Sequence, residues 1–252
     1  MTVRFMTGTP GSGKSYHMLE EIIAHLEKGK PVIANFPLNF TEGMARKGFY
    51  ERFMFVPDDV LMGARGVSML INLSVSKGWF DDDSIPENYC MLVMDECSNH
   101  FPPEQSTNPV QKVWQQFFRQ HRKLKYEPYL ISQDKTDISK RINSVVEYHV
   151  DHRCVNSVFP FSLLPFKIFA YVTYWKRSKI STGSTILVKR FANLYKTHRL
   201  FGQIDKDMER ILALATEDEM AFECKFGNLL PADVGDAQRG EHRPTSQEAD
   251  AV

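Results

Sequence analysis

The 252-residue sequence lacks several features that would place it in a specialised class. It has no excess of charge of either sign, because 31 lysines and arginines balance 31 aspartates and glutamates. No overall field therefore attracts it to nucleic acid or anionic lipid, and such contacts need local patches. Its 4 cysteines show neither metal-ligand spacing nor the density of a disulfide scaffold, which indicates reduced thiols.

Long apolar runs are missing too. The most aromatic segment, residues 158–175, is interrupted by Pro160, Pro165 and Lys167. It leaves no uncharged run near the roughly 20 residues that a membrane-spanning helix needs. We interpret the segment as a loop that leads into an aromatic strand, with contact at a membrane surface as the less favoured alternative. The chain as given is not predicted to cross a bilayer.

What the sequence does contain is a phosphate-binding motif near its N-terminus. The motif fits G-x-x-x-x-G-K-[ST] at every position, and it consists of Gly8, Thr9, Pro10, Gly11, Ser12, Gly13, Lys14 and Ser15. An apolar strand is predicted before it, over residues 3–7, and an amphipathic helix after it, from Tyr16 to Lys28. In this context the glycines turn backbone N–H groups inward around a phosphate, and the helix N-terminus adds the positive end of its dipole.

We therefore predict that the residues from Gly8 to Tyr16 bind ATP. Lys14 is expected on the β- and γ-phosphates, and the Ser15 hydroxyl is expected to be a ligand of Mg²⁺. A glycine-rich turn that binds nothing is the alternative, and the strand and helix on either side of the motif disfavour it.

The remaining pattern predicts an α/β fold, a P-loop NTPase with a mostly parallel central sheet flanked by helices. Buried strands are expected at residues 31–35, 53–56, 90–94, 128–132 and 148–154, and helices near 58–59, at 108–125 and at 137–145. Residues 67–75 are apolar and fit either a helix or a strand.

The C-terminal part is predicted to add a β-hairpin and a helix. Strands at residues 168–175 and 185–191 flank a basic tip at 176–184, and the helix is expected at 205–216. One ATPase domain therefore covers residues 1–230, including the hairpin region 155–200. The polar residues 231–252 lack periodicity and are predicted to form a disordered tail.

Hydrolysis also requires a carboxylate near the metal and a group that activates water. The apolar run Cys90–Met94 ends in Asp95 and Glu96, at the edge of the sheet where ligands of parallel sheets bind. We predict that Asp95 holds Mg²⁺ through its water shell and that Glu96 is the catalytic base. An exposed acidic pair that only ends a strand is the alternative.

Two further groups complete the predicted site. Gln133 ends the next buried strand, where its amide can contact the γ-phosphate or the attacking water, although an ordinary strand-end glutamine explains it equally well. An arginine can come from a neighbouring subunit, and Arg119, Arg122 and Arg141 are the candidates. Arg122 is the first choice because it ends the helix between the two catalytic strands. A solvated basic face is the alternative for all three.

These motifs together resemble a known family. The features are the P-loop, the run Met91–Pro102, Arg119–Arg122 followed by Leu130–Gln133, and Leu194–His198. They are similar to those of the zonula-occludens-toxin-like (Zot) family, assembly ATPases of filamentous phages related to the FtsK/HerA branch of P-loop motors. The resemblance covers about residues 1–200. It departs at Cys97, where a small alanine is usual.

The resemblance implies an ATPase in the host cytoplasm, peripheral to the inner membrane, that drives secretion of viral single-stranded DNA. A homo-oligomeric ring, such as a hexamer, and phage coat or assembly proteins are the expected partners. Family members commonly continue into a transmembrane helix, so we expect contact with the host inner membrane through partners or a missing C-terminal segment. For contacts with the DNA backbone, the candidates are Lys123, Lys125 and the basic tip residues 176–179.

Three alternatives stay open from the residues. A genome-packaging ATPase of a membrane-containing phage belongs to the same class of motor. A P-loop small-molecule kinase would need an arginine-rich lid, and no such cluster is apparent in the sequence. A nucleotide-switched assembly scaffold has no need of a base, which Glu96 argues against.

Overall fold

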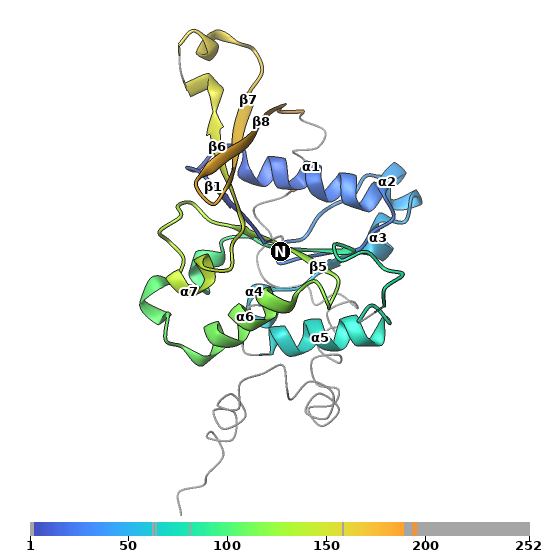
Figure 1. Ribbon diagram of the computed structural model, residues 1–252. Helices are drawn as coiled ribbons and strands as arrows, with labels where there is room; N and C mark the ends of the chain where they lie inside the picture. The colour runs from blue at the N-terminus through green and yellow to red at the C-terminus, as the bar shows by residue number, and fades with distance from the viewer. Residues whose placement is uncertain are drawn as a thin grey trace, which may run out of the picture.

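The computed structural model describes residues 3–61, 63, 65–80, 82–157, 159–188 and 194–195. Within these ranges one sheet of eight strands runs in the order β3-β2-β4-β5-β1-β6-β7-β8 (Figure 1). The strands are β1 (Arg4–Thr7), β2 (Val32–Ala34), β3 (Phe53–Phe55), β4 (Cys90–Met94), β5 (Tyr126–Ile131), β6 (Tyr148–Cys154), β7 (Ile168–Trp175) and β8 (Ser178–Ile186). The first six are parallel to one another, and β7 and β8 pair antiparallel. The predicted α/β fold with a mostly parallel sheet is confirmed.

Helices cover both faces of the sheet (Figure 1). The α-helices are α1 (Lys14–Glu27), α2 (Glu42–Arg46), α3 (Phe49–Arg52), α4 (Asp58–Leu61), α5 (Gly66–Ser76), α6 (Pro109–Gln120) and α7 (Lys140–Asn143). Short 3-10 helices occur at η1 (Cys97–Asn99), η2 (Pro103–Gln105), η3 (Val155–Ser157) and η4 (Phe161–Leu163). No helix in the described ranges is both long enough and apolar enough to cross a membrane.

The strand β4 shows why the core lies on both sides of the sheet. Its residues Met91 and Val93 pack into the cluster that α1 and α3 cover, whereas Leu92 and Met94 pack into the cluster under α5 and α6. Side chains of a strand alternate between faces, so a strand that is buried on both faces becomes one continuous apolar run. The position of β4 was predictable for this reason.

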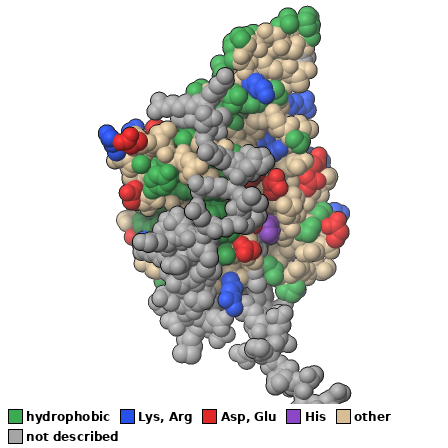
Figure 2. Space-filling model, turned by 180° about the vertical axis from the view of Figure 1, so that it is seen from behind, with side chains coloured by type: hydrophobic (Ala, Val, Ile, Leu, Met, Phe, Trp, Pro, Cys, Tyr) green, Lys and Arg blue, Asp and Glu red, His purple; other side chains and the backbone are tan. Residues whose placement is uncertain are grey.

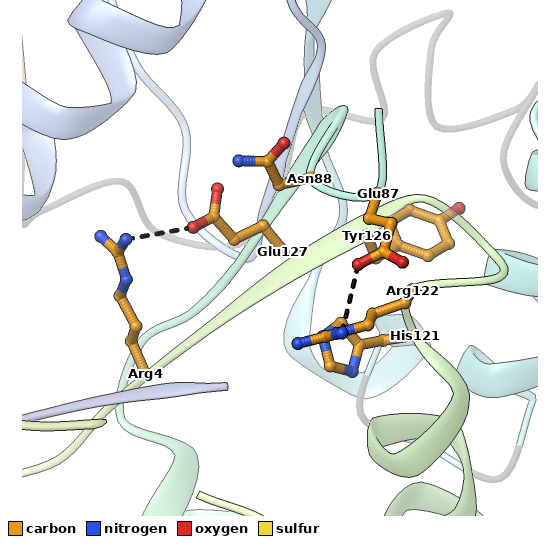
Figure 3. A pocket seen from close by; sticks show the side chains of 7 residues that line it. All are labelled: Arg4, Glu87, Asn88, His121, Arg122, Tyr126 and Glu127. Atoms are coloured by element: carbon orange, nitrogen blue, oxygen red, sulfur yellow. Dashed lines mark ion pairs between the residues drawn. The ribbon is translucent and has the colours of Figure 1, made fainter. Parts of the chain in front are cut away.

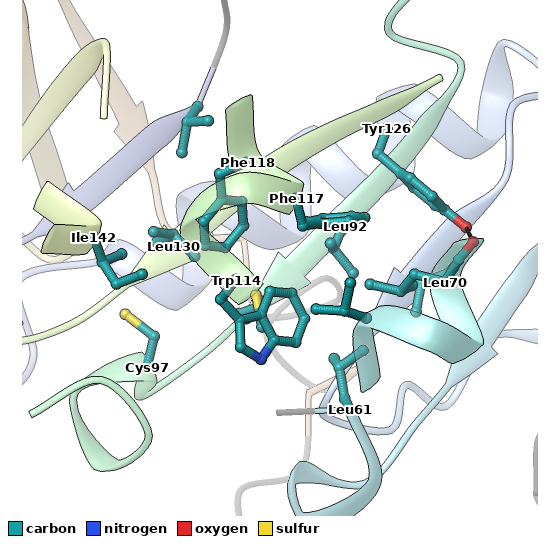
Figure 4. Packing of buried hydrophobic residues seen from close by; sticks show 14 of the residues in the cluster. Leu61, Leu70, Leu92, Cys97, Trp114, Phe117, Phe118, Tyr126, Leu130 and Ile142 are labelled. Atoms are coloured by element: carbon teal, nitrogen blue, oxygen red, sulfur yellow. Dashed lines mark hydrogen bonds between the residues drawn. The ribbon is translucent and has the colours of Figure 1, made fainter. Parts of the chain in front are cut away.

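Aromatic side chains of α6 fill the second cluster (Figure 4). Trp114, Phe117 and Phe118 lie three and four positions apart, on the face of the helix that meets β4 and β5. The Tyr126 hydroxyl donates a hydrogen bond of 2.7 Å to the Leu70 carbonyl oxygen and so fastens β5 to α5. This packing fixes the two strands whose ends carry the predicted catalytic residues.

Some predicted elements differ from the structure. Residues 67–75 lie in the helix α5, whose many apolar residues pack against the sheet and α6, while Ser68, Asn72 and Ser76 form a narrow polar face. The helix predicted at 108–125 begins as expected, with Asn108 as its N-cap, but it ends at Gln120. The helix predicted at 137–145 is reduced to α7, because Asp134 and Asp137 bind nearby backbone N–H groups and keep that segment in turns.

The predicted basic tip at residues 176–184 is wrong. β8 begins at Ser178, and only Lys176 and Arg177 form the turn of the hairpin, with Lys176 at φ 54°. The serines and threonines of β8 belong to a strand at the edge of the sheet, where exposed polar residues are tolerated. Lys125, a predicted DNA contact, is buried at 6% exposure. The predicted helix at 205–216 and tail at 231–252 lie outside the described residues, and the domain limits stay a prediction.

The packing of α6 leads to a test of the core. Trp114 is fully buried against Phe101, Phe117 and Phe118, so Trp114→Ala leaves a cavity and is expected to lower the free energy of unfolding by about 3–5 kcal/mol. Trp175→Ala is the matched control, because Trp175 is 43% exposed and should cost far less. Chemical denaturation measures both. Equal losses for the two variants would contradict this account of the core.

Candidate active site

Three strand ends bring the predicted catalytic segments to one edge of the sheet. β5 lies between β1 and β4, and all three are parallel, so the residues that follow them share the carboxyl edge. The P-loop follows β1, Gln133 follows β5, and the acidic pair follows β4. The Gly8 N–H donates a hydrogen bond of 3.0 Å to the Gln133 carbonyl oxygen and joins two of these segments.

The P-loop backbone has the form of an anion cradle. Gly13 is the N-cap of α1 at φ 95°, and the described residues provide no side-chain cap, so the first N–H groups of the helix have no acceptor within it. A Cβ on Gly13 would lie 2.3 Å from the Phe169 ring, and one on Gly8 would lie 2.6 Å from the His152 carbonyl oxygen. Ser12 Oγ is buried without a partner in the described part of the chain. These groups fit a bound phosphate.

Lys14 folds back over this cradle. Its ammonium donates hydrogen bonds to the carbonyl oxygens of Gly8 and Thr9, the latter at 3.3 Å. Partial burial lowers the pKa of Lys14, and the nearby charges of Asp95 and Glu96 oppose that shift. Lys14 and the acidic pair therefore share one electrostatic environment.

Asp95 is held on several sides. Burial raises the pKa of its carboxyl group, and hydrogen bonds from the Glu96 N–H at 2.9 Å and the Tyr195 hydroxyl at 3.1 Å oppose that shift. The Asn35 side chain accepts from the Asp95 N–H at 2.7 Å and donates to its carbonyl oxygen at 2.8 Å. Asn35, directly after β2, therefore fixes the Asp95 backbone, and the Glu96 N–H and the Tyr195 hydroxyl hold its carboxylate.

The oxygen atoms present suit Mg²⁺ bound largely through water and phosphate. Asp95 supplies a carboxylate and Ser15, in the first turn of α1, supplies a hydroxyl, and Mg²⁺ prefers oxygen ligands. In the part of the chain that the structure describes, no three His, Cys, Asp or Glu side chains form a metal cluster. Such a site is typical of Mg²⁺ held by one or two protein groups together with a nucleotide.

Glu96 differs from Asp95 in its surroundings. It is exposed and has a left-handed backbone conformation at φ 48°. A non-glycine residue in this region costs roughly 1 kcal/mol, and such residues cluster at functional sites. The conformation turns the chain directly after β4 into η1 and leaves the Glu96 side chain on the surface beside the P-loop, where water can reach it.

A pocket of about 640 Å³ adjoins the P-loop, and Gln133 lines it. Lys135 also lines it, held by an ion pair of 2.8 Å to Asp151, which in turn accepts a hydrogen bond of 2.7 Å from the Thr7 hydroxyl. The sequence analysis missed Lys135 and Asp151, although Lys135 lies only two positions after Gln133. The Tyr16 side chain points elsewhere, since its hydroxyl bonds to the backbone of Ile186 and Val188.

A buried pair of histidines supports the P-loop from behind. His152 Nδ1 lies 3.2 Å from the Thr7 carbonyl oxygen, which can only accept, so that nitrogen carries a proton. Burial and His17 lower the pKa of His152 to about 4, so its Nε2 is an acceptor at neutral pH. His17 Nδ1, 2.8 Å away, then donates to it. The Tyr171 ring of β7 stacks on the His17 ring, with the ring centroids 3.9 Å apart, and completes the contacts behind the P-loop.

Arg122 lies at the opposite edge of the sheet (Figure 3). It precedes the first residue of β5, lines a separate pocket of about 400 Å³ and pairs with Glu87 at 3.3 Å. Arg119 is exposed on α6, and Arg141 donates a 2.7 Å hydrogen bond to the Ser106 carbonyl oxygen. None of the three lines the pocket beside the P-loop of its own chain. A role for Arg122 toward a neighbouring subunit stays a prediction.

Comparison with known proteins decides the family. The model of the zonular occludens toxin (Zot) family matches residues 2–168. The chain belongs to this family. No curated protein matches the chain.

Several solved structures are similar to the chain. The N-terminal domain of zonular occludens toxin from Neisseria meningitidis is 16% identical, with a TM-score of 0.47, and the match covers 77% of this chain and 98% of that one. The genome packaging NTPase B204 of Sulfolobus turreted icosahedral virus 2 was solved with AMP and with ATP-gammaS. The AMP complex is 16% identical, with a TM-score of 0.45, and covers 73% of this chain and 96% of its own.

The burial of Asp95 leads to a stability prediction. A carboxyl group whose pKa is raised in the folded state costs stability at neutral pH, and the cost disappears as the pH falls through that raised pKa. Asp95→Asn should therefore raise the melting temperature at pH 7. The gain should shrink at acidic pH.

Thermal denaturation over a pH series measures this effect. Asp83→Asn is the matched control, because Asp83 is exposed and its charge costs little. A lower melting temperature for Asp95→Asn at neutral pH would show that the hydrogen bonds of the carboxylate outweigh its burial.

Proposed function

We propose that the chain is a Mg²⁺-dependent ATPase that drives the assembly and extrusion of filamentous virions at the host inner membrane. The observation that carries the proposal is the meeting of Lys14, Asp95 and Glu96 at one edge of a parallel sheet, beside an uncapped helix N-terminus. Membership of the Zot family supports the phage context. The homo-oligomeric ring and the single-stranded DNA substrate are part of the proposal.

Each residue contributes a separate effect. The backbone N–H groups from Gly13 onward bind the phosphates, and the Lys14 ammonium exchanges the carbonyl oxygens of Gly8 and Thr9 for phosphate oxygens. Mg²⁺, when bound, neutralises charge on the transferring phosphoryl group. Asp95 orients the water molecules around that site, and Glu96 accepts the proton of the attacking water.

Gln133 and Lys135 extend the site on the side of β5. The Gln133 amide lies where it can orient the attacking water or contact the terminal phosphate. Lys135 is already neutralised by Asp151, so it places a cation in the pocket without an unpaired charge when the pocket is empty. A bound phosphate that draws Lys135 away from Asp151 would change the contacts of β6, so the strand would respond to nucleotide binding.

A phosphate-release assay tests the function and the role of Glu96 together. Glu96→Gln keeps the shape of the side chain but removes the base, so it should bind ATP normally and hydrolyse it about 10²–10⁴-fold more slowly. Glu104→Gln, at an exposed position of η2, is the matched control and should keep the wild-type rate. Normal turnover in Glu96→Gln would remove Glu96 as the base.

The same assay separates the kinds of motor. Stimulation of the wild-type rate by single-stranded DNA supports the extrusion motor. Stimulation only by double-stranded DNA would favour a packaging ATPase instead. Phosphate transfer to a small molecule would identify a kinase, and the absence of turnover under all conditions would leave a nucleotide-switched scaffold.

A further inference from the structure

The connection between β6 and β7 carries an exposed group of large apolar side chains. Residues 155–157 and 159–167 project beyond the sheet, and Figure 2 shows hydrophobic side chains at the end of this projection (Figures 1 and 2). The exposed fractions are 76% for Phe159, 45% for Phe161, 76% for Leu163 and 41% for Phe166. We call these four residues the apolar tip. Soluble proteins seldom expose so many neighbouring large apolar side chains without a binding role.

The apolar tip is held in shape by one side chain. Asn156 Nδ2 donates hydrogen bonds to the carbonyl oxygens of Phe161 at 3.0 Å and Phe166 at 2.9 Å, while Asn156 Oδ1 accepts from the Ile168 N–H at 2.7 Å. Backbone polar groups of the loop are thereby satisfied inside it, and the apolar side chains face outward. Irregular backbone enters an apolar medium at low cost only when its polar groups are paired in this way.

The apolar surface continues onto the adjacent end of β8. The Leu187 N–H donates a hydrogen bond of 2.9 Å to the Lys167 carbonyl oxygen, which brings this end of β8 beside the base of the loop. Ile186 and Val188, on either side of Leu187, are 52% and 45% exposed. The exposed apolar area therefore includes two segments that are far apart in the sequence.

The charged side chains at the two bases of the loop are both basic. Residues 152–204 contain no aspartate or glutamate and 9 lysines and arginines, of which Lys176, Arg177 and Lys179 lie at the other end of the hairpin. Arg153 and Lys167 are exposed at the two bases of the loop, and Arg153 also lines the pocket beside the P-loop. An apolar projection between basic side chains is the arrangement that binds the interface of an anionic bilayer, where acyl chains lie below negative headgroups.

We propose that the apolar tip inserts into the interfacial region of an anionic membrane, with Arg153 and Lys167 on the headgroups. This docking rests on the membrane location in the proposed function, to which it adds a contact surface, and it does not require ATP hydrolysis. The Phe and Leu side chains of the apolar tip offer no hydrogen-bonding groups for nucleic acid bases, and the basic turn at Lys176 lies at the other end of β7. A symmetric contact between two copies through this surface would bring like charges together.

Flotation of the full chain with lipid vesicles tests the proposal. We expect wild-type protein to float with vesicles of phosphatidylglycerol and phosphatidylcholine, and to float much less with phosphatidylcholine alone. The double variant Phe159→Ser/Leu163→Ser should lower the partition coefficient by about 100-fold, since each large apolar side chain contributes about tenfold. The matched control, Trp175→Ser/Ile180→Ser, removes two apolar residues outside the apolar tip that are 43% and 52% exposed, and it should float like wild type.

Two more variants examine the shape and the charge of the site. Asn156→Ala keeps every apolar side chain but removes the bonds that shape the loop, so it should also weaken flotation. Lys167→Gln should weaken flotation only with anionic vesicles and mainly at low salt. ATP hydrolysis in the absence of vesicles serves as the folding control and should be unchanged in the double variant.

Several results would overturn the proposal. One is equal flotation of wild type and the double variant, and another is no flotation of wild-type protein. A double variant that loses its oligomeric mass in light scattering, with vesicle binding unchanged, would assign the apolar tip to a subunit contact. A double variant that loses only single-stranded DNA binding would assign it to nucleic acid. Failure of ATP hydrolysis in wild type would contradict the proposed function but leave the flotation result standing.

Discussion

The candidate active site depends on one constraint: the opposite charges of Lys14 and Asp95 lie close together without a direct ion pair between them. Lys14 and Asp95 lie within electrostatic reach, yet Lys14 bonds to backbone carbonyl oxygens and Asp95 bonds to Tyr195 and the Glu96 N–H. Partial burial disfavours the charged form of both side chains. The phosphate and the divalent cation of the proposed function would relieve both costs at once.

The order of the strands creates that separation. With β5 between β1 and β4, the P-loop and the acidic pair stand one strand apart, and Gln133 lies between them. The strands on the other side of β1 then support the P-loop, through His152 of the parallel strand β6 against Thr7 and Gly8 and through Phe169 of the antiparallel strand β7 against Gly13. The apolar tip continues directly from β6, so the membrane docking proposed above would place the nucleotide pocket close to the bilayer.

The sequence predicted the features that have a local cause. The P-loop motif is local because the backbone geometry of one short loop sets its pattern. The five-residue apolar run of β4 is local because burial on both faces sets its pattern. Cys97, next to Glu96, is buried in the core under α5 and α6.

The features that escaped prediction depend on tertiary contacts. Tyr195 reaches Asp95 across 100 positions of sequence, and nothing near either residue indicates the contact. The hydrogen bonds between the Asn35 side chain and the Asp95 backbone were also not predictable, because the two residues follow different strands. β8 has the serine and threonine content of a loop, because an edge strand needs few apolar residues. The burial of Lys125 follows from the tight turn at φ 62° that joins α6 to β5.

The most direct test of nucleotide binding at this edge of the sheet is calorimetric titration of a slowly hydrolysed ATP analogue, in the presence of Mg²⁺, into wild type and Lys14→Ala. The Lys14 ammonium is the nearest cation of the cradle, so its removal should weaken affinity by about 100-fold or more. Lys47→Ala is the matched control. It removes an exposed lysine that lies 4.0 Å from Glu27, and it should bind like wild type. Near-wild-type affinity in Lys14→Ala would contradict the assignment of the P-loop as the nucleotide site.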